Sequence, residues 1–563
     1  MSRTLLKTSF VESSGRERAH SILDDQSYKE LLGPQDNIES PHLEPQGIVP
    51  QSDDGVVVAK GTINEHPAIV ISIEGNFQGG GIGEVSGAKI AGVLELALKE
   101  CESGMRIIPV LVFDTGGVRL QEANYGVLSI AEIGAAIVAL RRYVPVIAVI
   151  PGKIGAFGGM SITAGLCSKI IMTRGARLGL NGPEVIEQEA GIREFDSKDK
   201  QLIWGTIGGE QRTAAGFADV LIEDDADAIK EKISSFILED TVYSPRTLQG
   251  DRYETLLSLV EPEQRLSANE VRLLWKLSEN EEIKEKLPSL ESDKSTGRGQ
   301  TWFDLLRADF LEIGDIPSVR VADGMIGEKK VRFIAVVPDN QNRFPRARKG
   351  EVGLLEAWSI AKHVRNAIKA DQNSEKRTIV AIVDVPSQAY GYHEELLGIH
   401  QACAAAVDAY ASARLEGHPV ISFIPGNAIS GAFLSHGMQA NRLIALHDEG
   451  VNVHVMSKQS AARITQRTLE ELEIATKKVP AMAYDIKSFE KLGALFSLVD
   501  GVEASSPEKK DRDIIYKEID RAIEDVRTDN SRDLSGRLSS SYAQSGGRAA
   551  SILVREKLRE QWK

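Results

Sequence analysis

Short apolar runs alternate with longer amphipathic stretches along the chain from Gly55 onward. Apolar runs such as VVVAKGTI, HPAIVISIEG and VPVIAVIPGK are separated by helix-like stretches at residues 87–101 and 126–142. Buried strands that alternate with amphipathic helices are typical of an α/β domain. Residues 1–45 are polar instead. We expect them to be largely helical, with SFVESSGRERAHSILD as a short amphipathic cap.

The second half of the chain repeats this pattern. The segment RTIVAIVDVPSQAYG, which starts at Arg377, matches RIIPVLVFDTGGVRL, which starts at Arg106. In both halves an alanine-rich helix follows, and then a strand that ends in a glycine loop. Asp114 and Asp384 lie 270 residues apart in this alignment. An ordered series of elements at one offset indicates a duplicated structural unit, and such repeats are settled before single motifs.

A charged stretch, SENEEIKEKLPSLESDKSTGRGQ, separates the two repeats and lacks apolar periodicity in its second part. The chain of 563 residues is too long for one core and suits two domains of about 250 to 300 residues. We therefore predict one α/β domain over residues 1–285, a linker over 286–300 and a second α/β domain over 301–563.

Two glycine loops in each half lie where a strand ends and a helix begins. Free backbone N–H groups at such a position can bind phosphate or stabilise an enolate oxygen. Two converging loops would form an oxyanion hole. The alternative is that these glycines only permit tight turns and close packing. The candidate positions are Gly116, Gly117, Gly158 and Gly159 in the first half and Gly391, Gly431 and Ala432 in the second.

Other catalytic signatures are weak. The glycine-dense loop at residues 77–90 has neither the G-x-G-x-x-G spacing nor the ending of a phosphate-binding loop. Ser430 is followed by Gly431, with His436 six residues on, but neither half contains a G-x-S-x-G elbow. The ten histidines show no H-x-x-x-H pair with an acidic third ligand, so we predict no metal site.

Composition narrows the class of protein. The net charge of −14 argues against a nucleic-acid partner or an anionic membrane surface. The longest apolar runs, such as residues 144–150, are far shorter than the roughly 20 residues of a membrane helix. The N-terminus is too polar for a signal peptide, and three unpaired cysteines fit a reducing compartment. We expect a soluble cytoplasmic protein.

Several motifs resemble known families. DTGGVRLQEA, GAFGGMSITAG and GGGIGEVSGAKI resemble the N-terminal half of acyl-CoA carboxyltransferases, and DVPSQAYGYHEELLGI and GNAISGAF resemble the C-terminal half, whose loops bind the biotin carbonyl. In closer detail, LNGPEVIEQEAGIREFD is similar to the beta subunit of malonate decarboxylase, and NRFPRARKGEVGL and AMAYDIKSFEKLG to its gamma subunit. The resemblance implies two crotonase-like α/β domains in tandem, related by a pseudo-two-fold axis.

The same resemblance implies an activity and partners. The expected reaction is decarboxylation of malonyl-S-acyl-carrier-protein to acetyl-S-acyl-carrier-protein and CO₂. The expected partners are the delta carrier subunit, which bears a phosphoribosyl-dephospho-coenzyme A arm, and the alpha acyl-transferase subunit, with a homo-oligomer as the assembly. No cofactor is expected on this chain itself. The alternatives are a carboxyltransferase that passes the carboxyl group to biotin on another protein, and a non-catalytic scaffold.

By this resemblance the first-half glycines hold the thioester carbonyl, and the second-half loop faces them. Candidates for its polar contacts or proton donor are Gln388, Tyr392, His393 and Ser430. The segment Ser387–Gln388–Ala389–Tyr390 departs from the apolar loop of typical carboxyltransferases, which puts a biotin role in doubt. For the substrate or the carrier arm, or for an acidic carrier helix, the candidates are Gly80, Gly81, Gly83, Arg343, Arg346 and Arg348; a solvated loop is the alternative for the arginines.

Overall fold

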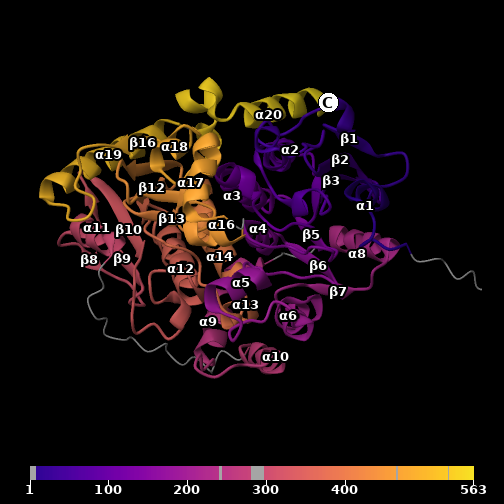
Figure 1. Cartoon of the computed structure of the whole chain (residues 1–563), viewed down its shortest axis with the longest axis horizontal. Helices are drawn as coiled ribbons and strands as arrows, with labels where there is room; N and C mark the ends of the chain where they lie inside the picture. The colour runs from indigo at the N-terminus through magenta and orange to yellow at the C-terminus, as the bar shows by residue number, and fades with distance from the viewer. Residues whose placement is uncertain (1–7, 240–243, 280–296, 465–466, 530–531) are drawn as a thin grey trace, which may run out of the picture.

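The computed structural model describes residues 8–239, 244–279, 297–464, 467–529 and 532–563. Two seven-stranded sheets form its centre, one in each half of the chain (Figure 1). The first has the order β1-β2-β3-β4-β5-β6-β7, and the second has the order β16-β14-β12-β11-β10-β9-β8. The first-sheet strands are β1 (Lys29–Leu31), β2 (Val56–Ile63), β3 (His66–Ile73), β4 (Ile108–Val112), β5 (Ile147–Ile150), β6 (Lys169–Thr173) and β7 (Val220–Ile222). The second-sheet strands are β8 (Leu311–Glu312), β9 (Val319–Ile326), β10 (Lys329–Val336), β11 (Thr378–Ile382), β12 (Val420–Ile424), β14 (Arg442–Leu446) and β16 (Ser497–Val499).

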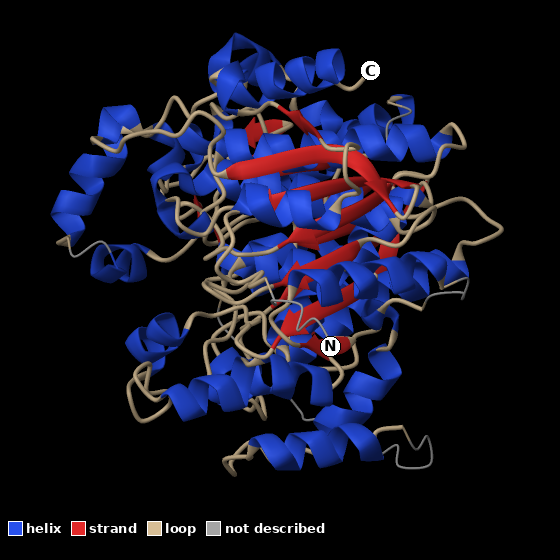
Figure 2. Cartoon of the chain, turned by 90° about the vertical axis from the view of Figure 1, so that its right-hand side faces the viewer, coloured by secondary structure: helices blue, strands red, loops and turns tan. Residues whose placement is uncertain are grey.

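The two sheets have matching topology. In each, an antiparallel pair (β2 with β3, β9 with β10) leads into a run of parallel strands. The parallel strands β4 and β11 are buried along their whole length and, apart from Thr378, apolar, because helices cover both faces of such a sheet. Helices flank the strands on the outside of the fold (Figure 2). The predicted α/β fold with an internal repeat is confirmed.

The helices of the two halves also correspond. The three that pack around the centre of the first half are α2 (Glu84–Glu102), α3 (Ala123–Leu140) and α4 (Gly159–Leu166), and their counterparts are α12 (Leu354–Ala370), α14 (Ile399–Leu415) and α15 (Ser430–Ser435). Across the interface, α3 contacts α14 and α15, while α14 contacts α3 and α4. Such an exchange of equivalent contacts is what a two-fold relation between the halves produces.

The remaining elements cover these cores. They are α1 (Gly15–Ile22), α5 (Pro183–Ala190), α6 (Lys200–Ile207), α7 (Gly209–Ala214), α8 (Ala226–Leu238), α9 (Gly250–Ser258), α10 (Ala268–Leu277), α11 (Arg298–Arg307), α13 (Tyr392–Leu396), α16 (Lys458–Ile464), α17 (Leu469–Lys478), α18 (Ile486–Glu490), α19 (Lys509–Thr528) and α20 (Ala549–Gln561), with the small β13 (Asn427–Ile429) and β15 (Asn452–His454) pair. Most of the predicted linker 286–300 lies outside the described residues, and its last three residues begin α11.

The prediction that residues 1–45 are largely helical is wrong. Within the described part of that segment, α1 is the one α-helix, followed by β1 and two short 3₁₀ turns. Tertiary contacts hold the segment instead. Arg18 is buried, donates to the main-chain oxygens of Phe10 and Val11, and pairs with Asp114 at 2.9 Å. Pro34 and Pro45 also sit in the first turns of those 3₁₀ segments, where a longer helix cannot continue through them.

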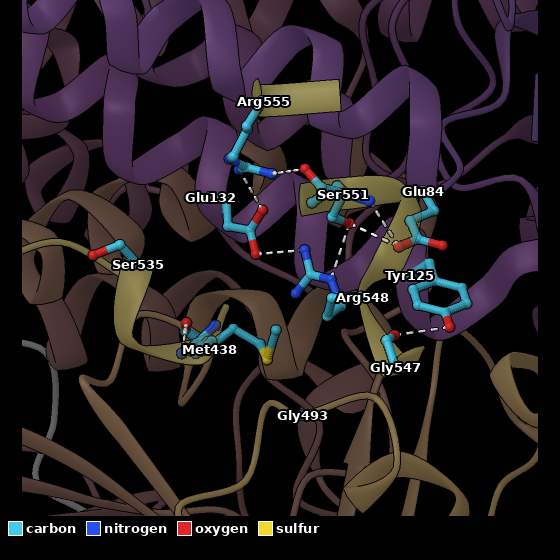
Figure 3. A network of polar contacts seen from close by, with 12 residues as sticks. Glu84, Tyr125, Glu132, Met438, Gly493, Ser535, Gly547, Arg548, Ser551 and Arg555 are labelled. Carbon is cyan, nitrogen blue, oxygen red and sulfur yellow. Dashed lines mark hydrogen bonds and ion pairs between the residues drawn. The ribbon is translucent and has the colours of Figure 1, made fainter. Parts of the chain in front are cut away.

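One segment of each half packs on the other half. α9 lies on α12, where Tyr253 stacks on Trp358 with ring centroids 4.8 Å apart. In return, α20 crosses to the first half and packs on α2 (Figure 1). There Arg555 and Arg548 each bind Glu132 of α3 at 2.8 Å (Figure 3). The two halves of the sequence are thus joined by reciprocal packing as well as by the peptide chain.

The helical stretch Leu120–Leu140 has the length and hydropathy of a membrane span, the one such stretch among the described residues. Its apolar window is fully buried in the protein interior. This burial follows from the position of α3 between the first sheet and the second half of the chain.

Candidate active site

A cavity of about 370 Å³ lies between the two halves. The first half contributes the loop after β4, the loop before α4 and the segment before α5. The second half contributes the loop after β11 and the start of α15. The residues on which the following argument depends are Val118, Gly159 and Asn181 from the first half and Gln388, Tyr390 and Ser430 from the second.

The two first-half loops touch one another through glycines. Gly117 and Gly158 have φ values of +105° and +56°, and a Cβ atom on Gly117 would come within 3.1 Å of the Cα atom of Gly158. Only glycine fits such a contact in this backbone conformation. Gly117 and Gly158 therefore permit the close contact between the two turns, as the alternative interpretation of these glycines predicted. Its consequence is that the amides next to them are brought together.

Most of the predicted amide donors are engaged inside the protein. The amide of Gly116 donates to Gly79 O at 2.8 Å, that of Gly117 to Thr115 Oγ1 at 3.0 Å, and that of Gly158 to Leu180 O at 3.0 Å. Among the described residues, the amides of Val118 and Gly159 have no protein acceptor. Both residues line the cavity. The available pair of donors is therefore Val118 with Gly159, and Val118 was missed because its side chain gives no signal.

The other predicted glycines lie outside the cavity lining and pack closely against neighbouring residues. A Cβ atom on Gly80 would stand 2.1 Å from Asp114 O, and one on Gly83 would stand 2.1 Å from Glu122 Oε2. Gly81 packs in the same way against Arg119. In the second half, a Cβ atom on Gly391 would clash with the Glu394 carboxylate. These four glycines allow close packing, and they are not among the residues that line the cavity.

The second-half loops hold a polar cluster in the cavity wall. The amide of Gly431 donates to Gln388 Oε1 at 3.0 Å, and Gln388 Nε2 donates to Asn181 Oδ1 at 2.7 Å. Ser430, at the turn from β13 into α15, has a φ of +62°, which is uncommon for a residue with a side chain. Ala432 is buried in the first turn of α15 and does not line the cavity.

Two predicted polar residues lie elsewhere. Tyr392 Oη donates to Leu266 O at 2.7 Å, and His393 Nε2 accepts from the Leu266 amide at 3.3 Å. Burial lowers the pKa of His393 from its ordinary value. Both side chains fix a first-half segment to α13 rather than facing the cavity.

The three predicted arginines also make intramolecular contacts. Arg343 donates to the main-chain oxygen of Val260, Arg346 pairs with Glu194 at 3.1 Å, and Arg348 donates to Asn342 O at 2.9 Å. Two of these contacts join the second half to the first. A carrier-binding role for this segment stays a prediction. Its contacts with the first half of the chain are observed in the structure.

Tyr390 is a cavity residue that the sequence did not single out for a role. Burial raises the pKa of its phenol, and the nearby Glu189 carboxylate raises it further, while a hydrogen bond with Ser430 opposes both effects. The phenol therefore keeps its proton across the neutral range. No pattern in the sequence around Tyr390 indicated that its side chain would line the cavity.

A buried carboxylate fixes the cavity wall. Glu395 accepts the amides of Asn181 and Leu180 at 2.6 and 3.2 Å, and it lies 3.3 Å from Arg212. Burial raises the pKa of Glu395 to about 7, and Arg212 and the amides oppose that rise. The carboxylate thereby ties α13 of the second half to the segment that carries Asn181.

We expect Glu395→Gln to lower the free energy of unfolding by about 1–3 kcal/mol. The glutamine nitrogen would face an amide donor that the carboxylate now accepts, which leaves a buried polar group without a partner. Urea unfolding at pH 8 measures the change. Glu210→Gln, which removes a carboxylate paired with Arg174 at the surface, should cost less than about 1 kcal/mol. Equal losses in the two variants would contradict this role of Glu395.

No group of three or more histidine, cysteine, aspartate and glutamate side chains could hold a metal ion in the part of the chain that the structure describes. The cavity wall instead presents backbone amides, the hydroxyl groups of Tyr390, Ser430 and Ser460, the primary amides of Asn181 and Gln388, and the charged side chains of Arg177 and Glu184. Apolar side chains such as Val118 and Leu434 complete its wall.

Comparisons with known proteins find a matching family model, related curated proteins and related solved structures. Residues 347–562 match the family model described as malonate decarboxylase gamma subunit. Two curated proteins of Malonomonas rubra are each similar to part of this chain. Malonyl-S-ACP:biotin-protein carboxyltransferase MADC is 43% identical over 41% of this chain and 75% of its own length. The MADD protein of the same description is 36% identical over 39% of this chain and 74% of its own length.

Among solved structures, one chain of a Pseudomonas malonate decarboxylase hetero-tetramer in complex with malonate is 52% identical. The match covers 48% of this chain and 99% of that chain, with a TM-score of 0.48. The chain has the duplicated α/β fold that the sequence resemblance implies, with a cavity between paired glycine loops. The chain belongs to the malonate decarboxylase family, with the counterparts of its beta and gamma subunits joined in one polypeptide.

Proposed function

We propose that this chain releases CO₂ from a malonyl thioester carried on an acyl carrier protein. The observation that supports it most directly is the pair of unengaged amides, Val118 and Gly159, on touching loops in one cavity. Loss of CO₂ from a malonyl thioester leaves an enolate, whose oxygen carries the new charge. Preorganised amide donors at about 2.7–3.1 Å from that oxygen lower the barrier.

The steps balance without an oxidant or reductant. The bond between the carboxylate carbon and the α-carbon breaks, and its electron pair moves into the thioester to form the enolate. The amides of Val118 and Gly159 stabilise the oxygen. Tyr390 then gives its proton to the α-carbon, and Ser430, its hydrogen-bond partner, connects the phenol to a new proton from solvent. The products are CO₂ and the acetyl thioester.

The proposal includes the setting of the reaction. The names of the relatives point to an acyl carrier protein as substrate and to a multi-subunit complex, as in the Pseudomonas hetero-tetramer. We propose a delta-type carrier with a phosphoribosyl-dephospho-coenzyme A arm, an alpha-type acyl-transferase partner and no cofactor held by this chain itself. A homo-oligomeric assembly and a cytoplasmic location complete the proposal, and three buried free cysteines are consistent with that compartment.

The second candidate function is transfer of the carboxyl group to biotin, which the names of MADC and MADD describe for those proteins. The two reactions share the enolate and differ in the fate of CO₂. The purified chain, supplied with the malonyl carrier, should release CO₂ at a rate that avidin does not change. A block by avidin would favour the biotin route. No CO₂ under either condition would leave a scaffold as the better description.

A further inference from the structure

The two halves contain equivalent pairs of amides, but only one pair is open. In the first half, Val118 forms a bridge with Ile82; in the second half, Gln388 forms the same bridge with Val352. The loops before α4 and α15 match through the bridges of Ala156 and Ala428, three residues before Gly159 and Gly431. Gln388 and Gly431 are thus the second-half counterparts of Val118 and Gly159. By the fold alone, the protein has two sites for an anionic or carbonyl oxygen.

The second site already holds an oxygen. Gln388 Oε1 accepts the amide of Gly431 at 3.0 Å, so the side chain of one loop occupies the acceptor position at the amide donor of the other. The orientation of this amide group is fixed, because its Nε2 donates to Asn181 Oδ1 at 2.7 Å and Asn181 Nδ2 donates to Ala389 O at 3.1 Å. Gln388 is 4% exposed and Asn181 is 2% exposed. In this series of hydrogen bonds each donor faces an acceptor, which is the condition for a stable buried polar network.

We propose that the side chain of Gln388 is a built-in ligand that closes the second amide site to an external carbonyl group. A carboxyl acceptor of the cyclic urea class, such as biotin, would need that site for its carbonyl oxygen. With the site closed, no acceptor nitrogen is held beside the departing CO₂, which then leaves as product. The release of CO₂ in place of its transfer rests on the proposed function, whereas closure of the second amide site is measured by ligand binding alone.

Opening the site permits a different fate for the carboxyl group. A urea N–H would lose its proton to the enolate carbon, and the nitrogen would form a bond to the carbon of CO₂. The products would be the acetyl thioester and an N-carboxylated urea. The first-half pair, Val118 and Gly159, would still stabilise the enolate. Gln388 would therefore determine specificity between release and transfer, without touching the bond that breaks.

The test measures binding of 2-imidazolidinone, a small cyclic urea, and of free biotin by ligand-observed NMR and calorimetry. Gln388→Ala and the smaller polar variant Gln388→Ser remove the internal acceptor. Both should bind the urea on the order of tenfold more tightly than the wild type, since up to two amide hydrogen bonds become available to it. Gln388→Glu keeps an oxygen at the Gly431 amide and should bind no better than the wild type.

A matched control removes another buried interdomain glutamine. Gln439 donates to Ala131 O at 2.9 Å and lies outside the cavity lining, so Gln439→Ala should leave urea binding at the wild-type level. Wild-type binding as tight as that of Gln388→Ala, or no gain in either opened variant that melts cooperatively, would overturn the proposal. Because binding is read without turnover, a wild-type protein that releases no CO₂ would count against the proposed function alone.

Discussion

Replacing Gly159 by proline is expected to lower the turnover of the malonyl thioester by about 10² to 10³. Proline deletes one of the two amide donors that the structure leaves open to the cavity. The fold should tolerate the change, because Gly159 is the first residue of α4, a position where proline is common. The preceding Gly158 has a ψ of −146°, outside the helical region that a following proline disfavours. Steady-state rates with the malonyl carrier, together with circular dichroism, measure the effect.

Gly159→Ala is the matched control for this prediction. It keeps the amide but adds a Cβ atom 2.6 Å from Leu434 Cδ1, the flexible end of a side chain in α15. We expect its turnover to stay within about tenfold of the wild type, because the donor itself remains. If the folded proline variant turns over as fast as the alanine variant, the amide of Gly159 does not stabilise the enolate.

Tyr390→Phe is expected to lower kcat by about 10² to 10⁴, the range for loss of a positioned acid, with a much smaller change in KM. The phenol lines the cavity, and burial raises its pKa, so it holds a proton at every pH in the neutral range. Removing the hydroxyl takes away the proton donor and leaves the ring in place. Initial rates over a range of malonyl-carrier concentrations separate the effect on kcat from that on KM.

The neighbouring tyrosine provides the control. Tyr392→Phe removes a hydroxyl that donates to Leu266 O outside the cavity. This variant should keep its turnover and lose about 1 kcal/mol of stability, the usual contribution of one neutral hydrogen bond. A wild-type kcat in Tyr390→Phe would assign the proton to Ser430 or to water.

The sequence by itself determined the fold class and its duplication. Strands such as β4 and β11 are short and almost entirely apolar segments, and the longer helices α2 and α12 precede them in the chain. Local patterns of this kind depend on burial alone, so they can be read before any contact is known. The sequence also located the glycine turns, because backbone with positive φ, as at Gly117, favours that residue type.

The tertiary structure decided which groups at those turns are available. Whether the amide of Gly117 or that of Val118 is free depends on where the Thr115 hydroxyl lies, which no pattern along the chain records. The same holds for Gln388 and Gly431, whose hydrogen bond closes one of two equivalent sites. The predicted His393 lies against Leu266, 127 residues away in sequence, for the same reason. Hydrogen-bond partners distant in the chain are selected by packing, and the chemistry of a site depends on the donors that packing leaves unpaired.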